Sequence, residues 1–130
     1  MIDTLTLLIT AILFGGMVFY SFGFAPVLFA QLSSEQVRPI LRGTFPYYYL
    51  VVIAVSAVAT AFAFTQSTMA GLLLGGICVS TIYARQILMI QINAATDRND
   101  KRAFGVLHGA SVVIQLIQIA LNAWALVILS

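Results

Sequence analysis

The sequence predicts an all-α polytopic membrane protein: a single domain in which four transmembrane helices form a bundle, with both termini outside the cytoplasm (N-out/C-out). Hydrophobic residues make up 62% of the 130 residues and charged residues only 8%, against roughly 25% charged residues in soluble proteins. Three short polar segments separate four long apolar runs, and nearly all basic residues fall in two of those segments. A soluble domain of this size could not bury so much apolar surface, so its solvent must be a lipid bilayer.

The first helix is predicted over residues 4–32. No charged residue occurs between Thr4 and Gln31, and a run of that length crosses a hydrocarbon core of about 30 Å even when it is tilted. Pro26 lacks a backbone N–H, so we expect it to kink or unwind the last third of this helix. The polar segment 33–43 contains proline and glycine, so it is predicted to be a loop, part of which could lie as a short helix at the membrane surface.

The other three helices follow from the remaining apolar runs. Pro46 is tolerated in the first turn of a helix, which places it at the start of the second one. Residues 66–68 are the only polar break before the next run, so the second and third helices should form a tight hairpin. A hydrophilic loop is predicted over residues 96–102. The predicted helix boundaries are 44–65, 69–95 and 103–129.

The orientation follows from the basic residues beside the membrane, which favour the cytoplasmic side. Five of the six bases lie in the two loops over residues 33–43 and 96–102, and the N-terminus, the middle loop and the C-terminus carry none. Both basic loops are therefore predicted to be cytoplasmic, in a multi-pass protein of the cell inner (plasma) membrane. These bases are Arg38, Arg42, Arg98, Lys101 and Arg102.

The last helix carries its polar side chains on one stripe. The stripe residues are His108, Ser111, Gln115, Gln118 and Asn122, at spacings of three and four. At about 100° per residue they fall within roughly 80° of one another. Amides that face lipid cost several kcal/mol each, so the stripe must face protein or water. It either hydrogen-bonds the helices together or lines a polar cavity.

The third helix offers a facing stripe. Cys78, Thr81, Arg85 and Asn93 lie near one face of it. From the rise of about 1.5 Å per residue we expect Asn93 beside His108 and Arg85 beside Gln115. Arg85 lies about 15 Å from the loop by the same rise, and no span contains a carboxylate to neutralise it. An ionisable residue at that depth indicates a functional site, and the alternative is an arginine that reaches the lipid phosphates.

His108 lies one turn inside the last helix, where it either relays protons, caps a polar vestibule or is simply a hydrogen-bonded interfacial histidine. Further ligands for a metal ion would have to come from Cys78 and Met89. Cys78 is about 20 Å from His108 along the bundle, so the two cannot share an ion and no metal site is expected.

Gly71 and Gly75 form a GxxxG motif, which favours packing inside the bundle and, second to that, a homodimer face. One hydroxyl of Tyr47–Tyr49 is expected to face the polar stripes.

Familiar catalytic patterns are missing. The sequence has no phosphate-binding loop, no Ser-His-Asp set, no paired carboxylates and no histidine pair for haem. It therefore favours a protein that is not an enzyme and that carries no cofactor. A net charge of +2 is too small to indicate a nucleic-acid partner.

Several segments resemble a known family. The first helix ends with Phe24-Ala25-Pro26-Val27-Leu28-Phe29, and the second opens with Thr44-Phe45-Pro46-Tyr47-Tyr48. The other segments are Gln91-Ile92-Asn93 with Asp97-Arg98, and Phe104 to Val112, which includes Leu107-His108-Gly109-Ala110-Ser111. Together these are similar to the transmembrane-protein-205-like family, catalogued as domain of unknown function 4149.

The resemblance implies a small four-helix membrane protein with a eukaryotic relative linked to resistance against a platinum drug, and it supplies no established reaction. It would make Pro26, Pro46, Asn93, His108 and Ser111 family residues. Gln115 departs from the pattern, because an asparagine is common there.

The leading functional hypothesis is a small carrier or channel-like protein whose polar cavity opens to the cytoplasm and takes an anionic or metal-complex solute. Arg85, Asn93, His108, Ser111 and Gln115 are the predicted binding residues. Four helices make a narrow bundle, so transport would need a homo-oligomer. The rival hypothesis is a non-catalytic subunit or assembly factor of a larger membrane complex, in which the stripes only hold helices together.

Overall fold

The computed structural model describes all residues from Met1 to Ser130, and every regular element in it is helical. The first span joins α1 (Ile2–Val18), the π-helical segment η1 (Phe19–Phe24) and α2 (Ala25–Gln31) without a break. The second span is α3 (Ser34–Ala63). The third joins α4 (Thr68–Tyr83), the π-helical segment η2 (Ala84–Leu88) and α5 (Met89–Asp97), and the fourth is α6 (Lys101–Leu129).

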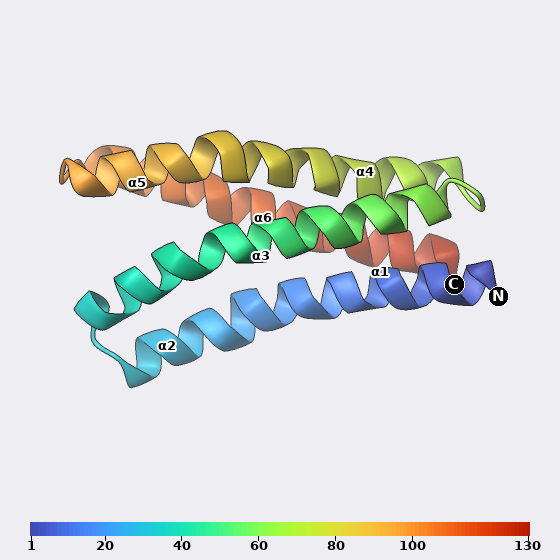
Figure 1. Cartoon of the computed structure of the whole chain (residues 1–130), viewed down its shortest axis with the longest axis horizontal. Helices are drawn as coiled ribbons and strands as arrows, with labels where there is room; N and C mark the ends of the chain where they lie inside the picture. Colours follow the sequence, from blue (N-terminus) through green and yellow to red (C-terminus); the bar gives the residue numbers. More distant parts are fainter.

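Each of these four spans is long and apolar enough to cross a membrane. The predicted fold class, an all-α bundle of four transmembrane helices, is therefore confirmed, and the chain is an integral membrane protein. Both termini lie at the same end of the bundle as the loop between α3 and α4 (Figure 1). We call this the terminal end. The opposite end holds the α2–α3 and α5–α6 connections together with the five bases of the two basic segments, and we call it the basic end (Figure 1).

The prediction of a loop over residues 33–43 is wrong, because helix α3 begins at Ser34 and runs unbroken to Ala63. A capping box starts it: the Ser33 N–H donates to Gln36 Oε1 at 3.1 Å, and the Gln36 N–H donates to Ser33 Oγ at 3.4 Å. Pro39 and Pro46 lie inside the helix. Each removes one backbone donor, but a proline φ is already helical, so α3 continues past both.

The predicted loop over residues 96–102 is also shorter in the structure. Only residues 98–100 separate α5 from α6. Asn99 has a positive φ of 56°, and the Asp100 N–H donates to the Ala95 carbonyl at 2.9 Å. This is a Schellman-type helix end, in which asparagine tolerates the left-handed conformation that the reversal requires.

The π-helical segments occupy corresponding places in the first and third spans. At the end of η1 the Ala25 N–H donates to the Tyr20 carbonyl, and at the end of η2 the Met89 N–H donates to the Ala84 carbonyl, both across five residues. Pro26 is the second residue of α2, so Ala25 separates it from η1. The helix is not unwound at Pro26, and the π turn precedes the proline. Such segments are frequent at functional sites.

The apolar core occupies the half of the bundle nearer the terminal end. It contains small residues of α3 and α4 and larger side chains such as Leu13, Met17, Leu74 and Ile77. Gly71 and Gly75 belong to this region, because a Cβ at Gly71 would lie 2.5 Å from the Phe64 ring and one at Gly75 would lie 3.5 Å from Thr60 Cγ2. The GxxxG face therefore packs inside the α3–α4 hairpin and is not free for a second copy. The half nearer the basic end is left to polar and aromatic side chains.

Candidate functional site

From Ser111 to Asn122 the polar stripe of α6 faces protein, as the sequence predicts, and its successive residues bond to different helices, whereas His108 at its basic end is exposed. Ser111 Oγ lies 3.4 Å from the Tyr49 hydroxyl of α3. Gln115 donates to the Tyr48 hydroxyl at 2.5 Å and to Ser21 Oγ of η1 at 2.8 Å. These contacts tie α6 to the second span and to the π turn of the first.

Gln118 and Asn122 continue the stripe toward the terminal end. Gln118 is 4% exposed and donates to Thr81 Oγ1 at 3.0 Å and to Ser80 Oγ at 2.7 Å, both on α4. Asn122 is fully buried, and its amide donates to the Thr10 carbonyl and accepts from the Phe14 N–H, each at 3.2 Å. For Gln115, Gln118 and Asn122 the polar group therefore serves to join helices.

A small cavity lined by both polar and apolar side chains lies on the basic side of these contacts. Its volume is about 60 Å³, and residues of α3, α5 and α6 line it. A space of this size accommodates a few water molecules or one small solute. The residues that line it are Arg42, Phe45, Tyr49, Met89, Ile92, Asn93, His108 and Ser111.

Two of the lining residues have no partner within the protein. Neither the Asn93 amide nor the His108 imidazole forms a hydrogen bond with another residue, and His108 only stacks on Phe104, with ring centroids 5.4 Å apart and planes at 5°. This contrasts with Gln115, which uses its amide on two neighbouring helices. Asn93 and His108 thus keep free polar groups in a shared cavity.

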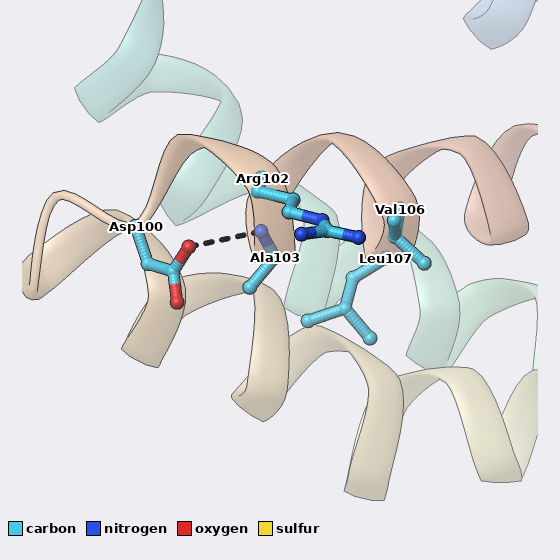
Figure 2. Close-up of a pocket in the computed structure, with 5 residues that line it drawn as sticks. All are labelled: Asp100, Arg102, Ala103, Val106 and Leu107. Carbon is cyan, nitrogen blue, oxygen red and sulfur yellow. Dashed lines mark hydrogen bonds between the residues drawn. The ribbon is translucent and has the colours of Figure 1, made fainter.

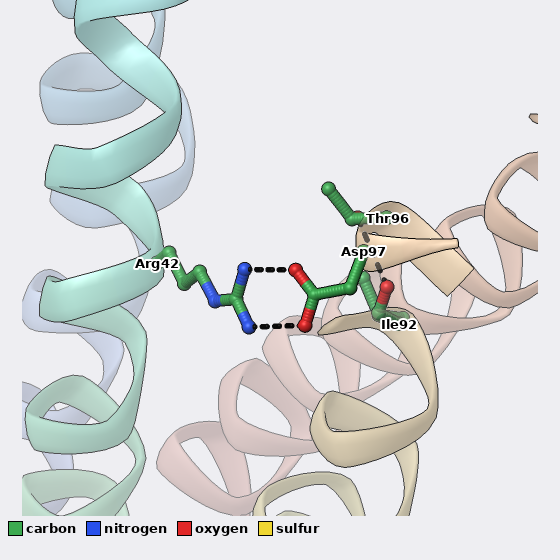
Figure 3. Close-up of polar contacts among 4 residues, drawn as sticks. All are labelled: Arg42, Ile92, Thr96 and Asp97. Carbon is green, nitrogen blue, oxygen red and sulfur yellow. Dashed lines mark hydrogen bonds and ion pairs between the residues drawn. The ribbon is translucent and has the colours of Figure 1, made fainter. Parts of the chain in front are cut away.

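An ion pair lies beside the cavity and shares Arg42 with its lining. Arg42 of α3 and Asp97 at the end of α5 form a bidentate pair, with N–O distances of 2.7 and 2.9 Å (Figure 3). Their side chains are 46% and 60% exposed. Arg42 is one of the cavity residues, whereas Asp97 is not. Arg42 therefore belongs both to the cavity lining and to the ion pair.

The Arg85 side chain bonds to the second span. The helical rise predicts a place beside Gln115; in the structure Arg85 Nε donates to the Pro46 carbonyl of α3 at 3.2 Å, and the residue does not line the cavity. Arg85 belongs to η2. Of the five predicted binding residues, the structure brings Asn93, His108 and Ser111 together and leaves Arg85 and Gln115 outside.

Sequence reasoning misses three side chains of this site. It places Arg42 in a loop, and the capping signal Ser33-x-x-Gln36 could have placed it on a helix instead. Tyr48 and Tyr49 both reach the polar stripe, where only one hydroxyl is expected. No three residues among His, Cys, Asp and Glu converge anywhere in the chain.

An aromatic cluster packs against the same level of the bundle. Tyr20 of η1 stacks on Tyr48 with ring centroids 4.0 Å apart and planes at 12°, and Phe24 and Phe45 pack on the Tyr20 ring. The Tyr20 hydroxyl is buried and has no hydrogen-bond partner. The adjacent Tyr48 hydroxyl, in contrast, accepts from Gln115.

We expect Tyr20→Phe to raise the free energy of unfolding by about 1 kcal/mol, because it removes a buried hydroxyl that has no partner and keeps the stacked ring. Tyr48→Phe removes a bonded hydroxyl and should lower the same quantity. Unfolding of the purified protein in detergent, followed by circular dichroism, measures both. A loss of stability in Tyr20→Phe would mean that the hydroxyl has a partner after all.

Comparison with known proteins gives a family but no activity. A family model described as "Domain of unknown function (DUF4149)" matches residues 8–101. The match covers the first three spans and ends at the start of α6, so His108 and Ser111 lie beyond it. Searches of curated proteins and of solved structures gave no significant match. Since the matched residues form well over half of the chain, this protein belongs to the DUF4149 family.

Proposed function

We propose that this protein is a small membrane carrier or channel-like protein, and that the cavity at its basic end binds an anionic or metal-complex solute. One observation carries the proposal. The deeper amides of α6 are all used to join helices, whereas Asn93 and His108 point free polar groups into the cavity. The half-buried Asn93 side chain and the exposed His108 side chain are therefore available to bond a ligand in the cavity.

The chemistry of the lining favours an anion. The Asn93 amide, the His108 ring N–H and the Ser111 hydroxyl are donors, and the Arg42 guanidinium is a permanent cation. A metal complex is the second class of solute, because the Met89 thioether and the His108 imidazole line the same cavity and are ligands that softer metals accept. No carboxylate lines the cavity itself, but Asp97 pairs with Arg42 from outside it and competes with an anion for that guanidinium.

The proposal also assigns a side to the cavity. Basic segments favour the cytoplasm, so the basic end would face inward and the cavity would open there. A Ser67→Cys variant in a Cys78→Ala background tests this, because Ser67 lies in the loop at the terminal end. We expect no labelling by a membrane-impermeant maleimide from the cytoplasmic side, and strong labelling would reverse the assignment.

Flux through reconstituted vesicles tests the activity. Vesicles that contain the protein and an anion-sensitive dye would be challenged with chloride, nitrate or formate. We expect Asn93→Leu and His108→Phe each to reduce the initial flux of a transported anion to less than half, because each removes a free donor from the cavity. Val113→Leu is the control, since Val113 is 54% exposed on the outer side of the same helix.

The activity is refuted if no anion in the panel crosses faster than in protein-free vesicles and metal complexes do not either. It is also refuted if Asn93→Leu, His108→Phe and Val113→Leu change the initial anion flux by the same amount.

A four-helix bundle encloses little space, so we propose that the transporting form is a homo-oligomer. Its size can be measured by cross-linking in the same vesicles.

A second candidate function is a non-catalytic subunit or assembly factor of a larger membrane complex. One observation favours it: a Cβ added at Gly105 or Gly109 on α6 would meet no atom within 4 Å, so another helix could approach these positions closely. Purification in a mild detergent separates the two functions. A stoichiometric foreign partner favours the subunit, and a homogeneous self-oligomer favours the carrier.

A further inference from the structure

A second hollow lies at the start of α6 and is separate from the cavity. It has a volume of about 410 Å³ and is open to the outside. Asp100, Arg102, Ala103, Val106 and Leu107 line it (Figure 2), and none of them lines the cavity of the proposed function. One wall is thus charged, and the other consists of apolar side chains. We call this hollow the α6 groove.

The acidic residue of the α6 groove is already bonded. Asp100 Oδ1 accepts from the Ala103 N–H at 3.0 Å, and Asp100 Oδ2 accepts from Arg98 Nε at 3.4 Å. The bond from Ala103 is the main reason that the pKa of Asp100 lies below its usual value, and the Arg98 contact adds to the effect. Asp100 therefore stays ionised at neutral pH, and its side chain bonds to Ala103 and Arg98 and forms no ion pair with Arg102.

The basic residue of the α6 groove, in contrast, has no anionic partner. Arg102 takes part in neither of the two ion pairs of the protein. Its side chain extends along α6, so that the guanidinium lies beside Val106 and Leu107 (Figure 2). A guanidinium beside apolar side chains at the end of a membrane span is complementary to an anion whose other part is apolar.

We propose that the α6 groove binds an anionic phospholipid, with the lipid phosphate on Arg102 and the start of an acyl chain on Val106 and Leu107. The planar guanidinium matches phosphate oxygens and can bond two of them at once. Bases at the end of a membrane span attract anionic lipids, and Arg98 and Lys101 beside the groove add to that attraction. The apolar wall favours a lipid over free phosphate, which would leave Val106 and Leu107 uncovered.

Lipid retention by the whole protein tests the proposal. The protein would be reconstituted in nanodiscs of phosphatidylcholine with one part in five phosphatidylglycerol, released gently, and weighed by native mass spectrometry. We expect phosphatidylglycerol to be retained in preference to phosphatidylcholine, and Arg102→Gln to reduce the retained amount at least threefold. Lys101→Gln is the matched control, because it removes the same charge one residue away and Lys101 does not line the groove.

Two further measurements distinguish a bound lipid from a phosphate site and from general charge attraction. Val106→Asn keeps every charge but makes the wall polar, so it should also reduce retention, whereas inorganic phosphate at millimolar concentration should not displace the lipid. Equal losses in Arg102→Gln and Lys101→Gln would overturn the proposal in favour of general charge attraction. Displacement by inorganic phosphate would overturn it in favour of a phosphate site. Circular dichroism of each variant confirms that the helices are retained before the comparison is made.

Discussion

Replacing Gln118 with methionine and Asn122 with leucine in one chain should lower the free energy of unfolding by about 2 to 3 kcal/mol, since each buried amide that bonds to a neighbouring helix contributes about 1 to 2 kcal/mol. Both replacements nearly conserve side-chain volume, so the loss reports on the polar contacts and not on a cavity. Gln118 holds α6 to α4, and Asn122 holds α6 to α1. Without the two amides, α6 makes only apolar contacts with its neighbours in this half of the bundle. Lipid chains offer the same apolar contacts, so little then favours the packed helix.

Reversible unfolding in mixed micelles, followed by circular dichroism, measures this loss. The control is a double variant with similar changes on the lipid-facing side, Val113→Leu with Leu116→Met, since both side chains are about half exposed. Because Gln118 and Asn122 are one helical turn apart, the single variants should be measured too, as neighbouring substitutions need not add. A double variant as stable as the wild type would show that these contacts only replace equally good ones in the unfolded, membrane-bound state.

Asp97→Asn and Arg42→Gln are expected to change solute affinity in opposite directions, if the cavity is the site of an anionic solute. Asp97 competes with such a solute for the Arg42 guanidinium. Removing the carboxylate frees the cation and should lower the half-saturating anion concentration roughly fivefold, within the usual range for coupled binding. Removing the guanidinium takes away the cation itself, so the same concentration should rise.

Concentration series of anion flux in reconstituted vesicles provide the measurement. Both substitutions break the same ion pair, so a pair that only holds α3 to α5 would shift both variants the same way, and that outcome would exclude a role in binding. Arg98→Gln is the control, because it breaks the other exposed ion pair, with Asp100, which lies outside the cavity. Exposed ion pairs contribute little to stability, so none of the three variants should unfold the protein.

The number of spans, the α3–α4 hairpin and the inward direction of the α6 stripe could all be predicted, because each depends on the cost of placing polar groups in lipid. That cost is large and needs no knowledge of neighbours. The start of α3 could not be placed from composition, since proline and glycine suggest a loop unless the capping box at Ser33 is recognised. A local hydrogen-bond pattern outweighed residue propensity there.

The candidate site could be predicted only in part, for a geometric reason. Asn93, His108 and Ser111 lie near the turn that joins α5 to α6, so a simple count of helical rise places them together. Arg85 belongs to η2, and no sequence signal gave the position of a π turn in the third span. The Arg42–Asp97 pair joins helices that are distant in sequence. It depends on how α3 packs against α5, which the residue pattern of a single helix does not reveal.

The spans are longer than the membrane they cross. Each has 29 or 30 residues, which corresponds to about 45 Å of helix against a hydrocarbon core of about 30 Å. Tilt takes up part of the surplus of roughly 15 Å. If the rest overhangs at the basic end, where the charged side chains are, His108 falls within that overhang, because it lies about 10 Å from the start of α6. Water would then reach the cavity directly, and a solute carried as proposed would have to cross only the stretch of α6 beyond Ser111.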